Sequence, residues 1–266
     1  MKKIYLTTLL GLVHFFLSAQ TEFVTTWKTD NQGTSTDNQI AIPTFPGETY
    51  NYSVDWGDGN SDNNINGGIT HTYAAPGTYT VSITGDFPRI YFNFLGDNEK
   101  LLTIEQWGDI AWSSMEAAFA ACLNLDVLAS DAPDLTNVTS MKDMFNSCSS
   151  LLGNNSMNNW DTRTVTDMSL LFASTNNFNA DISNWDTSNV IKMNGMFIMN
   201  DVFNQPIGAW NTSNVQNMAS MFNMTGSFNQ DISNWDVGNV TNMFGMFEDS
   251  QVFNQPLDGW DVSSVT

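Results

Sequence analysis

The 25 residues FNADISNWDTSNVIKMNGMFIMNDV, Phe178 to Val202, recur with small changes at Phe203 to Ser227 and at Phe228 to Val252. A further copy begins at Phe253 and reaches Thr266, halfway through the unit. One Trp, one Val, one Met and one Phe position keep the same spacing from copy to copy. A fixed period of about 20 to 50 residues is typical of a solenoid, in which a unit covers its apolar side chains only by stacking on its neighbours.

Weaker copies extend the period toward the N-terminus. WGDIAWSSMEAAF, Trp107 to Phe119, aligns with Trp185 to Phe197, and the next copy ends in LTNVTSMKDMF, Leu135 to Phe145. The copy that ends at Phe172 carries two extra residues at about Gly153 to Ser156. We therefore expect six copies and part of a seventh. Because the last copy lacks the residues that complete the others, we expect the chain to be a C-terminally truncated fragment of a longer protein.

Within one unit the periodicity changes. FNQDISNW spaces its apolar residues as a short extended segment does, whereas VTNMFGMF places Val240, Met243, Met246 and Phe247 at the spacing of one helical face. Each unit is thus predicted to be a short strand, a turn, a short helix and a turn. The predicted fold of this part is an α/β solenoid of coils of about 25 residues.

The stretch from Thr21 to about Asn98 lacks the period and is predicted to be a small antiparallel β-sandwich. In TYTVSIT, apolar and polar residues alternate as in a half-buried strand, and Gly and Asn clusters separate the runs. DGNSDNNINGG, Asp58 to Gly68, is interpreted as a loop. The predicted strands are Phe23 to Trp27, Gln39 to Pro43, Tyr50 to Asp55, Ile69 to Tyr73, Thr78 to Thr84 and Arg89 to Phe94.

Charge and the first residues indicate export. Met1 to Ala19 combines two lysines, a short apolar run and small residues before the expected cleavage point, which is the pattern of a secretory signal peptide. The chain has 8 Lys plus Arg against 28 Asp plus Glu, a net charge of −20. Such a surface repels phosphate backbones and argues against nucleic acid as a partner. We predict no transmembrane segment and a secreted, cell-surface-associated protein.

Two sets of strings resemble known families. VDWGDG, Val54 to Gly59, and HTYAAPGTYTVSITG, His71 to Gly85, resemble PKD-type immunoglobulin-like domains of secreted proteins. The FNQDISNWD strings with VTNMxxMF, where x varies, resemble the BspA-like leucine-rich-repeat surface proteins of bacteria. The resemblances imply a spacer or adhesion module followed by a curved right-handed solenoid that adheres to something, without enzymatic chemistry. The expected organisation is a signal peptide at 1–19, a PKD-like sandwich at 20–98 and a BspA-like repeat solenoid at 99–266.

Stacking places equivalent Trp residues in one column. Either they form a core ladder, or they form an exposed aromatic strip that stacks on sugars. The second alternative makes four of them candidate binding-surface residues: Trp185, Trp210, Trp235 and Trp260.

Aspartates also recur in register, with Asn211 interrupting their column. The carboxylates either cap turns through backbone N–H groups or hold Ca²⁺. The calcium candidates are Asp186, Asp236 and Asp261 in the array and Asp55 and Asp58 in the first domain. Calcium is the one cofactor considered, and we predict no catalytic or other cofactor-binding residue.

Cys122 and Cys148 occupy the same place in neighbouring copies. Coil spacing permits a disulfide, but the position follows an apolar face, and we favour two buried thiols over a bridge.

Three functions are consistent with these patterns. The first is non-catalytic adhesion or binding of an extracellular protein or glycan. The second is a structural stalk or self-associating surface component, which predicts homotypic association. The third is a secreted glycan hydrolase, which requires a suitably placed pair of carboxylates; the recurrence of the acidic residues in every copy favours an architectural role for them instead.

Overall fold

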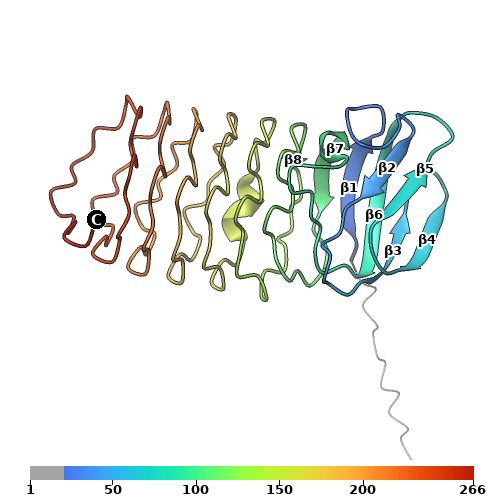
Figure 1. Cartoon of the computed structure of the whole chain (residues 1–266), viewed down its shortest axis with the longest axis horizontal. Coiled ribbons are helices and arrows are strands. Elements are labelled where there is room, and N and C mark those ends of the chain that lie inside the picture. The colour runs from blue at the N-terminus through green and yellow to red at the C-terminus, as the bar shows by residue number, and fades with distance from the viewer. Residues whose placement is uncertain (1–20) are drawn as a thin grey trace, which may run out of the picture.

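A computed structural model of the protein describes residues 21–266. The predicted signal peptide, Met1 to Ala19, lies outside the described residues. A small group of β-strands forms one end of an elongated molecule, and a row of stacked coils extends away from it (Figure 1).

The strands form a six-stranded sheet that packs with a two-stranded one. The larger sheet has the order β4 (Ser61–Ile65), β3 (Asn51–Asp55), β6 (Thr78–Asp86), β1 (Phe23–Lys28), β7 (Leu101–Gln106), β8 (Asp126–Val127). The smaller pairs β2 (Gln39–Ile42) with β5 (Ile69–Thr72). All neighbours pair antiparallel except β7 and β8. The predicted β-rich domain is confirmed.

Burial follows the alternation of the sequence. Val81 and Ile83 of β6 are buried, together with Phe23, Trp27 and Trp56. One predicted strand and one predicted loop are wrong. Arg89 to Phe94 forms only an isolated bridge, between Ile90 and Thr44, and the expected loop at Asp58 to Gly68 contains β4. β4 is an edge strand with four of its five residues exposed, so it lacks the apolar alternation by which strands are recognised.

The two parts of the chain share a sheet. β7 pairs antiparallel with β1 of the sandwich and parallel with β8, the first strand segment of the array. The predicted boundary at residues 98 and 99 therefore falls within the 3₁₀ turn η1 (Asn98–Lys100), just before the strand that joins both parts.

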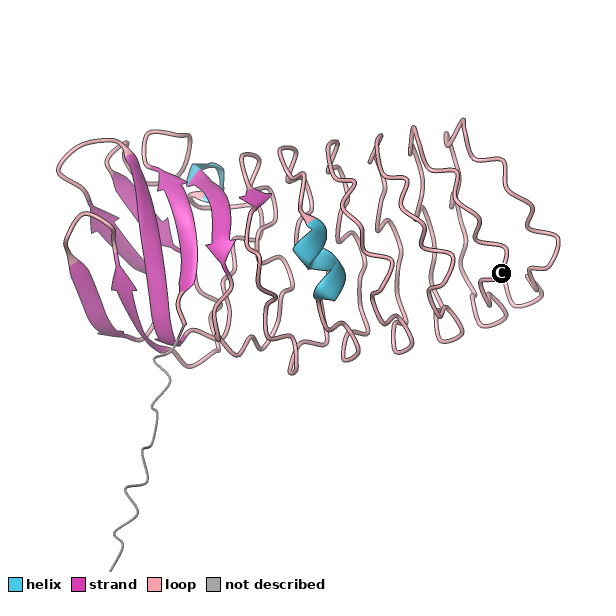
Figure 2. Cartoon of the chain, turned by 180° about the vertical axis from the view of Figure 1, so that it is seen from behind, coloured by secondary structure: helices cyan, strands magenta, loops and turns pink. Residues whose placement is uncertain are grey.

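Equivalent aromatic side chains of successive coils stack in columns. In the longest column, neighbouring Phe rings lie 5.7 to 5.9 Å apart between centroids, with nearly parallel planes. Its members are Phe119, Phe145, Phe172, Phe197, Phe222 and Phe247. The predicted register, including the divergent early copies, is thereby confirmed. The two extra residues near Gly153 are accommodated by the 3₁₀ helix η2 (Asn155–Asn159), the helix visible within the array in Figure 2.

The prediction of a short helix in each coil is wrong. The segment that carries the Met and Phe columns consists of consecutive turns, and the described residues contain no α-helix. Alternate N–H groups, those of Met193, Gly195, Phe197 and Met199, donate to carbonyl oxygens of the next coil at 2.8 to 3.0 Å. Between them, the N–H groups of Met196 and Ile198 donate to carbonyls three residues earlier. Turn bonds and coil-to-coil bonds together satisfy most of the backbone N–H groups that a helix would have satisfied internally.

This turn segment places two residues per coil in the left-handed region. One such position is occupied by Leu170, Gly195, Ser220 and Gly245, with φ between 54° and 61°. A side chain at this position lowers the free energy of unfolding by about 1–2 kcal/mol relative to glycine. Part of that difference cancels, because glycine also gives the unfolded chain more conformational freedom.

We predict that Ser220→Gly raises the free energy of unfolding by about 0.5–1 kcal/mol in urea titrations. Ser188→Gly, at a position with no positive φ, should lower it; stabilisation by both variants would contradict the explanation.

Side-chain amides bond one coil to the next. Asn179 Oδ1 accepts the N–H of Asn204 at 2.9 Å and the side-chain amide of Gln205 at 3.0 Å. Asn204 repeats both bonds toward the following coil. A second ladder runs from Asn189, Asn214 and Asn239, each of which donates to a carbonyl of the preceding coil at 2.7 Å. These ladders fix the register with which the coils stack.

Candidate functional site

The tryptophan column lies in the core. Trp185, Trp210 and Trp235 are 3 to 4% exposed, and Trp260 is partly buried. Each indole N–H donates to a carbonyl oxygen of the preceding coil, at 2.7 to 3.2 Å. Neighbouring rings stack on each other, as at 6.4 Å between Trp210 and Trp235. The alternative of an exposed strip for sugars is therefore wrong for the three buried residues, because their ring faces are covered by the adjacent coils.

The aspartates of the array cap turns. Asp186, Asp236 and Asp261 each accept, through Oδ1, the N–H of the residue two positions on, at 3.0 to 3.1 Å. Asn211 makes the same bond to Ser213. No group of three or more His, Cys, Asp or Glu side chains in residues 21–266 gathers as a metal site does. Calcium binding by these carboxylates stays a prediction.

Turn capping has a consequence for acid stability. Hydrogen bonds from the Ser188 hydroxyl and N–H lower the pKa of Asp186 below its ordinary value of about 3.9. A lowered pKa in the folded chain contributes stability that is present above the unfolded pKa and is lost as pH falls through the folded one. We predict that Asp186→Asn flattens the fall of unfolding free energy below about pH 4, because the amide, like that of Asn211, keeps the cap without titrating. An unchanged pH profile would contradict this.

The two first-domain candidates also lie in a turn. Asp55 accepts the N–H of Gly57 at 2.9 Å, and Asp58 accepts that of Asn60 at 3.0 Å and lies 3.0 Å from the His71 imidazole. Desolvation raises the pKa of Asp58, but the bonds from His71 and Asn60 outweigh it, and the pKa is lowered. His71 in turn stacks on Trp56 at 4.7 Å. These contacts hold the turn at the end of β3.

Cys122 and Cys148 are free thiols and fully buried, as favoured from the sequence. Burial raises the pKa of both thiols, and Cys148 Sγ lies 3.1 Å from the Phe119 carbonyl. A buried, protonated thiol is inert toward disulfide reagents. We predict that neither thiol reacts with 5,5′-dithiobis(2-nitrobenzoic acid) in the folded protein and that both react in denaturant; rapid reaction of the folded protein would contradict the burial.

A buried charged cluster was not predicted from the sequence. Lys100 is 0% exposed and donates to the carbonyls of Ser35, Thr36 and Gln39, at 2.8 to 3.1 Å, and to the Ser35 hydroxyl at 2.7 Å. Asp97 is 1% exposed and accepts bonds from the same segment. Every contact is made within the protein, so the cluster has a structural role.

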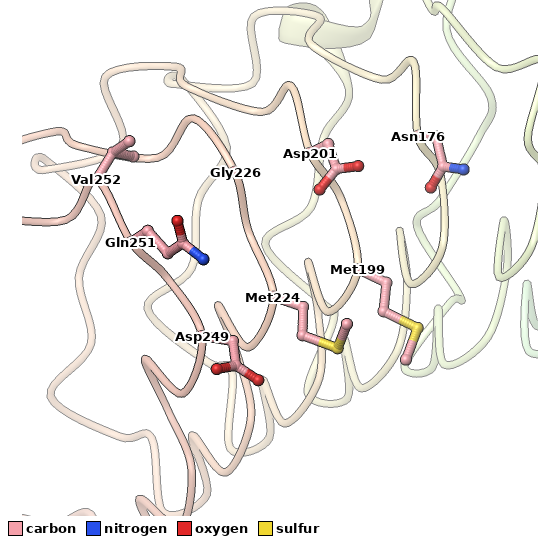
Figure 3. Close-up of a pocket in the computed structure, with 8 residues that line it drawn as sticks. All are labelled: Asn176, Met199, Asp201, Met224, Gly226, Asp249, Gln251 and Val252. Atoms are coloured by element: carbon pink, nitrogen blue, oxygen red, sulfur yellow. The ribbon is translucent and has the colours of Figure 1, made fainter.

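A hollow of about 630 Å³ opens on one edge of the last coils. We call it the edge hollow, and Figure 3 shows its residues. It is lined by Asn176, Met199, Asp201, Met224, Gly226, Asp249, Gln251 and Val252. Met199, Met224 and Val252 are 45, 43 and 42% exposed, although apolar residues of the same coils are buried. The sequence signal for this site was the appearance of methionine in a column that earlier holds Ala121, Ser147 and Ser174.

Comparison with known families assigns most of the chain. The family described as "Mycoplasma protein of unknown function, DUF285" matches residues 113–205 and 183–266, which together cover more than half of the chain. The chain belongs to the DUF285 family. The overlapping DUF285 matches fall on the stacked coils, so the family unit corresponds to the repeat array. The comparison does not identify the array as leucine-rich or BspA-like.

A PKD domain matches residues 15–86, which include β1 to β6. The PKD resemblance is thereby confirmed, and PKD domains are typical of extracellular proteins. No curated protein and no solved structure matches this DUF285 chain. Within residues 21–266, no helix has the length and apolar character needed to cross a membrane.

Proposed function

We propose that the protein is a secreted or cell-surface protein that binds an extracellular protein or glycan through its repeat array, without catalysing a reaction. The observation that carries the proposal is the edge hollow, where Met199, Met224 and Val252 of successive coils expose apolar side chains beside polar ones. Exposed apolar surface grouped with polar residues is typical of interaction sites. The PKD domain, which suits an extracellular setting, and the resemblance of the repeats to BspA-like surface proteins also support it.

The array suits binding because it is rigid and periodic. Backbone bonds and amide ladders join each coil to the next, so a surface side chain recurs at a constant spacing along the edge. A ligand that covers several coils then meets a preorganised surface, which lowers the entropic cost of binding. Hydrolysis is not part of the proposal, because the recurring aspartates accept hydrogen bonds from their own turns.

The proposal is tested by binding of the chain from Gln20 onward to immobilised extracellular matrix proteins, a glycan array and cell surfaces. An unrelated acidic protein of similar net charge serves as the control for general electrostatic attraction. Saturable binding to at least one surface above this control is expected. Absence of binding to every surface, or turnover of a polysaccharide that Asp236→Asn abolishes, would overturn the proposal.

A structural stalk is the second candidate, favoured by the same coil-to-coil bonds. It predicts concentration-dependent self-association in sedimentation velocity. A strictly monomeric protein at high concentration argues against it.

A further inference from the structure

The edge hollow contains two carboxylates without partners. Within residues 21–266, neither the Asp201 nor the Asp249 side chain has a hydrogen bond or an ion pair. Other aspartates of the array do: Asp186 caps a turn, and Asp167 lies 3.1 Å from the Lys192 ammonium. The two carboxylates of the hollow are therefore available to a cationic group from outside.

The methionine side chains of the hollow contribute little to the bonding between coils: Met199 Sδ accepts one weak hydrogen bond, from the Ser174 hydroxyl at 3.8 Å. Met199 and Met224 adopt φ of 57° and 56°, a region that is unfavourable for any residue with a side chain. Neither gains burial in return, because each is more than two-fifths exposed. Figure 3 shows the Met199 and Met224 side chains leaving neighbouring coils in the same direction, with their terminal methyl groups turned opposite ways. Methionine is flexible and polarisable, and exposed methionines are frequent at surfaces that adapt to an apolar partner.

Gly226 leaves the Asp201 carboxylate uncovered by a side chain of the next coil. Equivalent positions in other coils carry Asn176, Asp201 and Gln251. A Cβ at Gly226 would lie 3.1 Å from the Asp201 carbonyl oxygen and 3.3 Å from Asp201 Oδ1. Both contacts are tight, so glycine lets this coil lie close to Asp201 and adds no side chain that would cover the exposed Asp201 carboxylate.

We propose that the edge hollow binds a protein segment in which Lys or Arg stands beside an apolar side chain. This inference rests on the proposed binding function and names the partner of that site. Charge complementarity carries it, because the hollow offers two free carboxylates in a chain of net charge −20. Met199, Met224 and Val252 contact the apolar neighbour. A glycan fits less well, because sugar rings stack on flat aromatic faces and none of the residues that line the hollow is aromatic.

The probe is a fluorescein-labelled peptide in which Leu and Lys alternate over six residues, followed by fluorescence anisotropy. Two matched peptides replace every Lys by Glu or every Leu by Ser. We expect saturable binding of the Leu–Lys peptide, weaker binding of the Leu→Ser peptide and none of the Glu peptide. The binding should weaken with added salt, since the carboxylates are exposed.

Variants locate the binding. Asp201→Asn with Asp249→Asn should weaken it about tenfold, whereas Asp258→Asn, an exposed acid outside the hollow, should change it less than about twofold. Gly226→Gln should abolish binding, whereas Gly226→Ala, which brings the same Cβ to 3.1 Å from the Asp201 carbonyl oxygen without the longer side chain, controls for local strain and should keep most of it. Equal losses for Asp258→Asn and the double variant would show general attraction and overturn the inference.

The two proposals fail separately. If the chain binds matrix or cells and Gly226→Gln leaves that binding intact, the inference is overturned and the binding function stands. If no surface binds, the binding function itself is overturned, whatever the peptide does. If Gly226→Gln loses both surface binding and peptide binding, the binding function and the edge hollow as its site are both supported.

Discussion

Replacement of Lys100 by Met is expected to lower the free energy of unfolding by about 3–5 kcal/mol, one of the two largest effects we predict for a single substitution in this chain. The ammonium is fully buried and is satisfied by four oxygens of the segment from Ser35 to Gln39. Methionine fills a similar volume but donates nothing. It leaves the Ser35 carbonyl without its donor and Asp97 without a nearby compensating cation, whereas the Thr36 carbonyl keeps the Gln39 N–H and the Gln39 carbonyl lies 3.1 Å from the Ser35 hydroxyl.

The cost is large because the cluster joins three parts of the chain. Asp97 accepts the N–H groups of Thr34, Ser35 and Ala41, at 2.8 to 2.9 Å. The Ser35 hydroxyl lies between the two charged groups, accepting from Lys100 and donating to Asp97 at 2.5 Å. Lys100 itself precedes β7, the strand shared with the array. Loss of the cluster therefore releases the loop before β2 and loosens the junction.

Urea unfolding of Lys100→Met measures the effect, with Lys142→Met as the control. The Lys142 side chain is 43% exposed and lies 3.9 Å from Asp143, a weak surface pair that should contribute less than about 1 kcal/mol. The Lys100→Met, Asp97→Asn double variant should cost less than the sum of the single ones, since both remove one network. A loss below about 1 kcal/mol in Lys100→Met would show that the buried contacts are replaced by water.

The stacking could be predicted from the sequence, because column residues repeat at a strict interval and a ring such as Phe197 has no other way to be buried. The short helix predicted in each coil could not be excluded from the sequence. Met193, Met196 and Phe197 share one face in a helix and also point inward in the observed turns, so the apolar pattern is the same. What distinguishes the two is the backbone. Gly195 and Gly245 recur at one left-handed position, but Leu170 and Ser220 conceal that signal in the other coils.

The candidate sites, too, could be predicted from the sequence only in part. Trp210 is apolar in character and recurs in register, and its two alternatives could be separated only by burial. The edge hollow depends on the absence of a side chain at Gly226 and on exposure of Met199, neither of which has a sequence pattern of its own. Lys100 lies in a polar string, DNEK, where a buried ammonium is unexpected. The segment that satisfies it lies more than 60 residues away in sequence.

The second large effect concerns the core of the array: Phe197→Ala should lower the free energy of unfolding by about 3–5 kcal/mol. The ring is fully buried and lies 3.9 Å from Phe203, 5.7 Å from Phe222 and 5.9 Å from Phe172, between centroids. Removing it opens a cavity against three coils at once. Backbone bonds on both sides hold the coils at their spacing and resist collapse, so the cavity should persist.

The matched control is Met199→Ala, two residues along the same turn. That side chain is 45% exposed, so its loss should change the unfolding free energy by no more than about 0.5 kcal/mol. Both variants are measured by urea unfolding, followed by circular dichroism and by tryptophan fluorescence. Because each coil contacts only its neighbours, Phe197→Ala should also broaden the transition or separate the two signals as the array unfolds in parts. Equal costs for the two variants would mean that the turn, rather than the stacked ring, holds the coil in place.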